Sequence, residues 1–112
     1  MPRTDKRKHA RKVVSWPVHA TGSGIYLIGA EVRDVSDTGV FLRPNATDKL
    51  PEIGTHLSLM FFPQGRWQGT GLSTNATVSW TGDSRTHHCA GVGLTLDDTQ
   101  VGQELVSQAQ VL

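Results

Sequence analysis

The chain has 112 residues, 37% of them hydrophobic and 6% aromatic, and its formal net charge is +1. This length suits one domain, and a single cysteine cannot form an internal disulfide, which excludes a disulfide-stapled secreted scaffold. The charge is divided unevenly, because residues 1–12 hold six of the 11 basic residues and one acidic residue, whereas residues 13–112 carry a net charge of −4. The sequence therefore predicts an acidic body with a basic N-terminal arm.

The signals of membrane insertion and secretion are missing from the sequence. No stretch approaches the roughly 18 consecutive apolar residues of a membrane span. The basic N-terminus is not followed by the apolar segment of a secretory signal. We therefore expect a cytoplasmic protein without a membrane span.

Hydrophobic residues recur at every second position in the first part of the chain, as in strands with one buried face. The first predicted strand covers residues 14–20, where Pro17 indicates an edge or a bulge. A turn at 22–24 precedes a second strand over 25–36, in which Gly29 marks a predicted bulge. A tight turn follows, where Gly39 is expected to supply a positive φ, and it leads into a third strand over 40–43.

The same alternation continues after a loop over residues 44–54. A fourth strand is predicted over 56–61, followed by a turn at 63–65. The even positions from Leu72 to Trp80 share one face of a half-buried strand, and this pattern favours a core position for Trp80. A polar loop over 82–88 precedes a last strand, whose apolar face is expected to consist of Ala90, Val92, Leu94 and Leu96, with Gly91 and Gly93 on its other face.

The C-terminal segment changes to helical periodicity. Asp97 or Asp98 is suited to cap a helix start, where the helix dipole favours negative charge. Gly102 weakens the helix slightly. One apolar stripe follows from the spacing of Val101, Leu105, Ala109 and Leu112.

These elements together predict a mainly β fold, a six-stranded antiparallel β-barrel closed by a short C-terminal helix. Closure into a barrel is favoured because it removes exposed strand edges. The predicted organisation is a flexible basic arm over residues 1–12, a barrel over 13–97 and a helix over 98–112. With so little chain beyond the barrel, we expect the protein to signal through a separate protein and not through a fused effector domain.

Two short motifs carry the chemistry. Arg7 and Arg11 form an RxxxR pair just before the first strand, and residues 34–39 read Asp-Val-Ser-Asp-Thr-Gly at the end of the second. In this order and about 23 residues apart, they resemble the signature of the PilZ domain family, RxxxR followed by [D/N]xSxxG. The resemblance covers residues 6 to 98, and it implies a six-stranded antiparallel barrel that binds the bacterial second messenger cyclic di-GMP.

The resemblance also implies which residues bind the ligand. Arg7 and Arg11 would clamp phosphates and one guanine, because a guanidinium binds phosphate oxygens bidentately and stacks on bases. The other guanine would face Asp34, Ser36 and Gly39, whose carboxylate and hydroxyl can hydrogen-bond a base edge. Further candidate contacts are Lys6, Lys8, Trp80, Gly91 and Gly93.

Three of these further candidates leave alternatives open. The family places Trp80 near the binding face, as a contact or a fluorescence reporter. Gly91 and Gly93 either ease strand coiling or leave space beside the ligand. Lys6 stands where the family commonly has arginine, so the ligand could bind as one molecule or as an intercalated pair.

The arm predicts a mechanism of signalling without catalysis. A segment with a charge of +5 and few apolar residues should be mobile without ligand, and in the PilZ family this arm wraps over the ligand. We expect a non-enzymatic receptor without a cofactor. Ordering of its arm would be read by a partner protein that governs motility, adhesion or exopolysaccharide synthesis and so biofilm formation.

Other interpretations compete with this one. A small barrel with a basic arm could bind single-stranded nucleic acid, although the acidic body argues against a specific nucleic-acid partner. A degenerate PilZ domain could act as a protein-interaction module alone. The arm could be a solubilising or non-specific nucleic-acid tail, and residues 34–36 could simply form a turn that hydrogen-bonds its own backbone. A zinc site at His87-His88-Cys89 is disfavoured, since adjacent strand residues point to opposite faces, and the lack of metal ligands disfavours a hydrolase of the dinucleotide.

Overall fold

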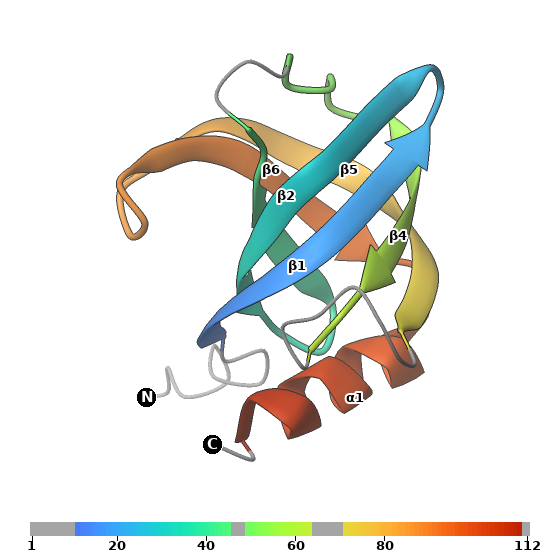
Figure 1. The fold of residues 1–112 in the computed structure, drawn as a ribbon, viewed down its shortest axis with the longest axis vertical. Coiled ribbons are helices and arrows are strands. Elements are labelled where there is room, and N and C mark those ends of the chain that lie inside the picture. Colours follow the sequence, from blue (N-terminus) through green and yellow to red (C-terminus); the bar gives the residue numbers. More distant parts are fainter. Residues whose placement is uncertain (1–10, 46–48, 64–70, 111–112) are drawn as a thin grey trace, which may run out of the picture.

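Six antiparallel strands close into a barrel, and one helix follows them (Figure 1). The computed structural model describes residues 11–45, 49–63 and 71–110. The order of the strands around the barrel is β1-β2-β3-β6-β5-β4. The predicted fold class is thereby confirmed. The bounds of the elements are β1 Lys12–Gly22, β2 Ile25–Val35, β3 Gly39–Arg43, β4 His56–Phe61, β5 Leu72–Ser84, β6 Cys89–Leu96 and α1 Thr99–Gln110.

The barrel interior is filled by the apolar residues that alternate along the strands. In β4, Leu57, Leu59 and Phe61 are buried while the residues between them are exposed. The period of two places successive side chains on opposite faces, so each strand contributes one apolar face to the core. Further buried core residues come from the other strands, among them Val14, Trp16, Val18, Ala20, Leu27, Val32, Val35, Val40, Val78 and Leu94.

The pairing of β1 with β2 is irregular at two places, one on each side of Pro17 and one of them opposite Gly29. Gly29 has a φ of 86° and lies in a segment of β2 where the register with β1 shifts, which confirms the predicted bulge. Pro17 lies between two such shifts. It lacks an N–H group, and its carbonyl accepts a hydrogen bond from the Phe62 N–H at 3.1 Å.

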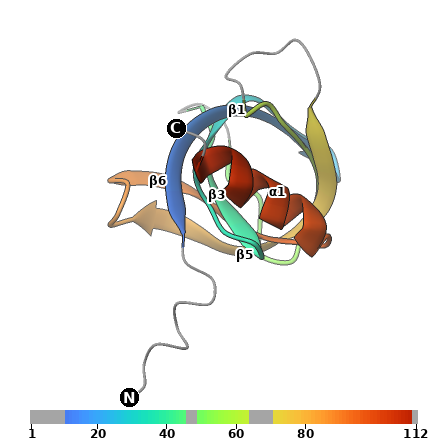
Figure 2. The ribbon, with the colours of Figure 1, turned by 90° about the horizontal axis from the view of Figure 1, so that it is seen from below.

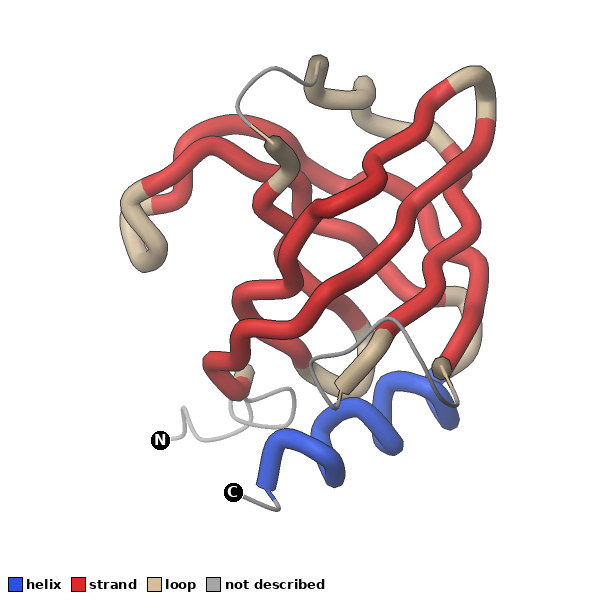
Figure 3. Tube along the Cα trace, in the orientation of Figure 1, coloured by secondary structure: helices blue, strands red, loops and turns tan. Residues whose placement is uncertain are grey.

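The segment over residues 82–88 is largely a hairpin and not the predicted loop. β5 continues to Ser84, which pairs with Cys89, and residues 85–88 make the turn. The end of this β5–β6 hairpin extends beyond the barrel (Figure 3). There the strands have no core to cover and lack an alternating apolar pattern, so Ala90 is exposed where the sequence predicted a core position.

Helix α1 lies across one end of the barrel (Figure 2). Its start is capped by Asp98, whose Oδ1 accepts a hydrogen bond from the Gln100 N–H at 2.9 Å, as expected of one of the two candidate caps. Leu105 is fully buried, and Val101 and Ala109 pack against the core. The predicted stripe is confirmed to this extent, while Leu112 lies outside the described residues. Within those residues, no helix has the length and apolarity needed to cross a membrane.

Candidate functional site

The two sequence motifs meet at the end of β2. Arg11 lies just before β1, and the pairing of Lys12 with Val35 places it beside Asp34. Its Nη1 donates to Oδ1 of Asp34 at 2.8 Å. The side chain of Asp34 is 10% exposed and that of Arg11 is 50% exposed. A buried carboxylate is therefore held by a guanidinium that faces solvent.

Ser36 shapes the turn that follows. Its hydroxyl oxygen accepts hydrogen bonds from the N–H groups of Gly39, at 3.1 Å, and Thr38, at 3.3 Å. Its own N–H donates to the Gly39 carbonyl at 2.8 Å. Such local bonds from serine to the backbone fix tight turns. Ser36 is buried and serves the shape of the loop, as in the alternative interpretation of residues 34–36 as a turn that hydrogen-bonds its own backbone.

Gly39 does not have the positive φ that the sequence analysis expected, so that prediction is wrong. Its requirement is one of space. A Cβ at this position would lie 2.7 Å from the Leu94 carbonyl oxygen across the β3–β6 pair and 3.8 Å from Nη2 of Arg11. Glycine therefore allows close strand approach while the arginine lies over the loop.

His87 is a site residue that the sequence analysis did not identify. It comes from the turn of the β5–β6 hairpin, yet its side chain is only 5% exposed. Its Nε2 lies 2.7 Å from Oδ2 of Asp34, and its ring stacks on Phe41 with 5.2 Å between centroids and 12° between planes. Since 53 residues separate His87 from Asp34, no local spacing signals this contact.

Trp80 lies near this cluster on the outside of the barrel. Its exposed fraction is 41%, so the core position favoured by the sequence is wrong. The register of β5 against β6 shifts between Val78 and Trp80, and this shift breaks the alternation that buries Ala76 and Val78. The Trp80 ring lies 5.5 Å from that of Phe41, between centroids.

The two β6 glycines serve different neighbours. A Cβ at Gly91 would lie 2.3 Å from the Phe41 ring and 2.4 Å from the Leu42 carbonyl oxygen. A Cβ at Gly93 would lie 3.6 Å from the Trp80 ring, which is ordinary contact. Gly91 thus permits the packing of Phe41, and Gly93 lies beneath the ring of Trp80.

Three candidate residues, Lys6, Arg7 and Lys8, lie outside the described residues. The described part of the chain contains no group of three or more His, Cys, Asp or Glu side chains placed to hold a metal ion. The structure thus brings together Arg11, Asp34, Ser36 and Gly39, with Trp80, Gly91 and Gly93 close by in β5 and β6.

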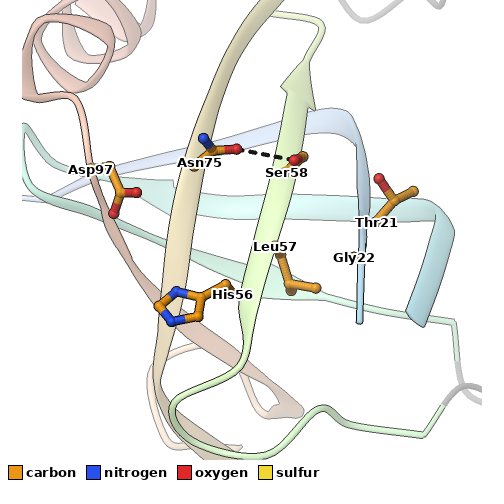
Figure 4. A pocket seen from close by; sticks show the side chains of 7 residues that line it. All are labelled: Thr21, Gly22, His56, Leu57, Ser58, Asn75 and Asp97. Atoms are coloured by element: carbon orange, nitrogen blue, oxygen red, sulfur yellow. Dashed lines mark hydrogen bonds between the residues drawn. The ribbon is translucent and has the colours of Figure 1, made fainter. Parts of the chain in front are cut away.

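A concavity lies over β1, β4 and β5, away from the motif cluster (Figure 4). Its volume is ≈ 400 Å³, and a hydrogen bond of 3.0 Å joins two of its side chains, Ser58 and Asn75. The described motif residues do not line it, since the motif cluster belongs to β2, β3 and the β5–β6 hairpin. The residues lining it are Thr21, Gly22, His56, Leu57, Ser58, Asn75 and Asp97.

Comparisons with known proteins support the fold. No family model and no curated relative matches the sequence. Among solved structures, the chain is similar to the inhibitor of motility MotI/DgrA of Bacillus subtilis, with 14% sequence identity and a TM-score of 0.67. The match covers 99% of this chain and 57% of that one, so this chain spans little more than half the length of its structural neighbour. The likeness establishes that the two proteins share a fold.

Proposed function

We propose that this protein is a non-enzymatic receptor for cyclic di-GMP, with the ligand bound at the loop over residues 34–39. The observation that carries the proposal is the ion pair between Arg11 and Asp34. It joins the two halves of a motif that resembles the PilZ signature, on a barrel of the kind that this resemblance implies.

The exposed groups around this ion pair suit the ligand. Cyclic di-GMP carries two phosphate charges and two guanines. Arg11 uses one nitrogen on Asp34 and has further donors for a phosphate or a guanine edge. The carboxylate of Asp34 has lone pairs left for guanine N–H donors, and the exposed ring of Trp80 offers a surface on which a base can stack.

Ser36 and Gly39 have an indirect role in this proposal. The Ser36 hydroxyl is engaged with the backbone of Thr38 and Gly39, so it holds the loop in the shape that presents Asp34. Gly39 keeps the surface beneath Arg11 free of a side chain. Arg7, with Lys6 and Lys8 beside it, would supply the second clamp from the arm.

The signal would pass to a separate protein in the cytoplasm when the arm closes over the ligand. A protein of the same fold is named as an inhibitor of motility in Bacillus subtilis. That name supports motility as the first process to examine for this chain, and adhesion and exopolysaccharide synthesis follow from the family resemblance.

Titration calorimetry with cyclic di-GMP tests the proposal. We expect wild-type protein to bind, and Arg7→Ala, Arg11→Ala and Asp34→Ala each to lose about 10- to 150-fold in affinity, the loss of one charge-assisted contact. Lys49→Ala removes one positive charge from an exposed loop residue outside the site, and it should bind like wild type. Wild-type affinity in both arginine variants would rule out the clamp.

A single-stranded nucleic acid is the second candidate ligand, and the exposed ring of Trp80 favours it. Binding to an oligonucleotide releases condensed counterions, so its affinity falls steeply as salt rises. Titration of a short oligodeoxynucleotide beside cyclic di-GMP, at two salt concentrations, separates the two. Stronger and steeply salt-dependent binding of the oligonucleotide would favour the second candidate.

A further inference from the structure

The turn of the β5–β6 hairpin contains a buried histidine that nothing in the proposed function requires. Turn residues usually face solvent, and His88, the next residue, does so. His87 instead folds back toward the end of β2, where its ring is covered by Phe41 and its Nε2 meets Asp34. In Figure 1 this hairpin leaves the barrel on the side where β2 ends, which brings its turn within reach of the loop.

Asp34 is held from two sides that differ in exposure. Arg11 reaches Oδ1 from solvent, whereas His87 reaches Oδ2 from within the structure. A carboxylate only accepts hydrogen bonds, so the Nε2 of His87 carries the hydrogen and donates it. Two oxygens offer about four lone-pair positions, and these two donors occupy one on each oxygen. In the proposed complex, the remaining positions would accept hydrogen bonds from a guanine edge.

Arg11 and His87 also differ in whether they must move when the ligand binds. When Arg11 turns its whole guanidinium toward a phosphate, and does not only offer its further donors, it releases the carboxylate that Nη1 holds. A buried carboxylate left without a partner is costly. His87 remains in place because its ring is packed on Phe41, so Asp34 stays paired and stays oriented while Arg11 moves.

We propose that His87 is a positioning residue of the ligand site, which fixes the carboxylate of Asp34 toward the guanine and allows Arg11 to leave it for the ligand. This inference rests on the proposed function and deepens it. It makes the β5–β6 hairpin a third element of the site, beside the arm and the loop over residues 34–39.

Two substitutions separate the hydrogen bond from the ring packing. His87→Phe keeps a ring on Phe41 but lacks the donor, and His87→Gln keeps an N–H donor in the place of Nε2 but lacks the ring. In calorimetry with cyclic di-GMP, we expect His87→Phe to weaken binding by about tenfold or more and His87→Gln to retain affinity within about threefold. His88→Gln is the matched control, and it should bind like wild type.

Melting temperatures of the ligand-free variants show whether each one is folded. Wild-type affinity in a folded His87→Phe protein overturns the inference, and so does a folded His87→Gln protein as weak as His87→Phe. A wild type that does not bind cyclic di-GMP overturns the proposed function itself. The first two results, obtained with a wild type that binds, leave the receptor function standing.

A measurement on the wild type covers the case in which a variant fails to fold. In protein labelled with ¹⁵N at histidine, we expect a slowly exchanging Nε2–H signal from His87, assigned by its loss in a folded variant or by its contact with Phe41. The signal should persist when cyclic di-GMP saturates the site. Loss of the signal on binding would show that His87 releases Asp34, and it would overturn the inference.

Discussion

Gly91 and Gly93 lie two residues apart on one face of β6, but they differ in the space around them. A Cβ at Gly91 would overlap the ring of Phe41 and the backbone of Leu42, whereas a Cβ at Gly93 would make ordinary contact with Trp80. Neither residue has a positive φ, so alanine is compatible with the backbone at both positions. A comparison of alanine substitutions at the two positions therefore measures the effect of packing on stability.

We expect Gly91→Ala to lower the free energy of unfolding by about 1–3 kcal/mol, the usual cost of overpacking. Gly93→Ala should leave it unchanged or raise it by up to about 1 kcal/mol, because alanine restricts the unfolded chain. Urea denaturation of both variants beside wild type measures the difference. Equal stability of the two variants would contradict the assignment of Gly91 to the packing of Phe41.

Glu31 is the centre of a polar network on the outer surface of β1, β2 and β3. Burial raises its pKa, but hydrogen bonds from Ser15, Arg43 and Arg33 outweigh this effect and hold the pKa below the ordinary value of 4.5. A carboxyl group with a lowered folded-state pKa stabilises the fold above its unfolded pKa. This contribution is lost as the pH falls through the folded-state value.

The free energy of unfolding should therefore fall more steeply in wild type than in Glu31→Gln as the pH is lowered from about 5 to 3. Glu52→Gln replaces an exposed glutamate and serves as the control. Urea midpoints measured at several pH values provide the comparison. Parallel curves for wild type and Glu31→Gln would show that the network adds nothing to stability.

At the scale of elements, α1 packs directly on the proposed ligand loop. Gly102 is buried in the helix, and a Cβ there would lie 2.1 Å from the Asp37 carbonyl oxygen. The end of β6 is tied to the same loop, since the Leu96 N–H donates to the Thr38 carbonyl at 2.9 Å. Glycine at position 102 lowers the helix propensity of α1, but it also allows α1 to pack closely against the loop at Asp37.

Gly102→Ala sets two effects against each other. Alanine gains about 1 kcal/mol in helix propensity, but the contact with backbone forces the helix or the loop to move. We expect the packing cost to win, so that both the melting temperature and the affinity for cyclic di-GMP fall. Gln103→Ala, on an exposed position of α1, should leave both near wild type. A Gly102→Ala protein with a raised melting temperature would contradict this packing argument.

The elements also show what sequence patterns can and cannot predict. Alternation predicted β4 and the bulge at Gly29 because burial on one face dictates residue type there. It failed for the β5–β6 hairpin, whose end covers no core and so has no alternating signal. Trp80 was misplaced for a related reason, since a register shift within β5 changes which face a residue occupies.

Some features of the candidate site could likewise be predicted from the sequence, and others could not. The resemblance assigned Arg11 and Asp34 to one ligand site, and the structure joins them in an ion pair that the sequence analysis did not predict. Their binding of the ligand stays a prediction. The contact of His87 with Asp34 depends on how a hairpin folds back over a barrel, which no short spacing encodes. Ser36 and Gly39 were identified from the motif. The hydrogen-bonded turn at Ser36 was one of the alternatives that the sequence offered, whereas the close strand approach at Gly39 required the structure.

For the whole molecule, the loop over residues 34–39 is contacted by two segments that lie far apart in the sequence. Arg11 lies on it from the start of β1, and α1 packs against it from the end of the barrel. A change in the loop can therefore reach both the arm and the helix. This arrangement supports an output in which a partner protein reads the arm and the barrel together.

In the proposed mechanism, the opposite charges of the arm and of the rest of the chain would supply the driving force for closure of the arm. The arm over residues 1–12 carries +5, and the rest of the chain carries −4. A bound dianion adds negative charge at the base of the arm, so closure of the arm over the ligand brings opposite charges together. The attraction acts over roughly 10 Å at ordinary salt, and in the proposed mechanism the arginines of the arm would convert it into specific contacts.

We therefore expect amide hydrogen exchange in residues 3–10 to slow when cyclic di-GMP saturates the protein, because closure protects amides that the ligand then covers. Exchange in β4, which contributes no residue to the site, should change little and serves as the internal control. In Arg11→Ala at the same site occupancy, slowing should be weaker, since the arm loses the contact nearest the barrel. Unchanged exchange in a saturated wild type would show that the ligand binds without closing the arm, and the partner would then have to read the loop and α1 alone.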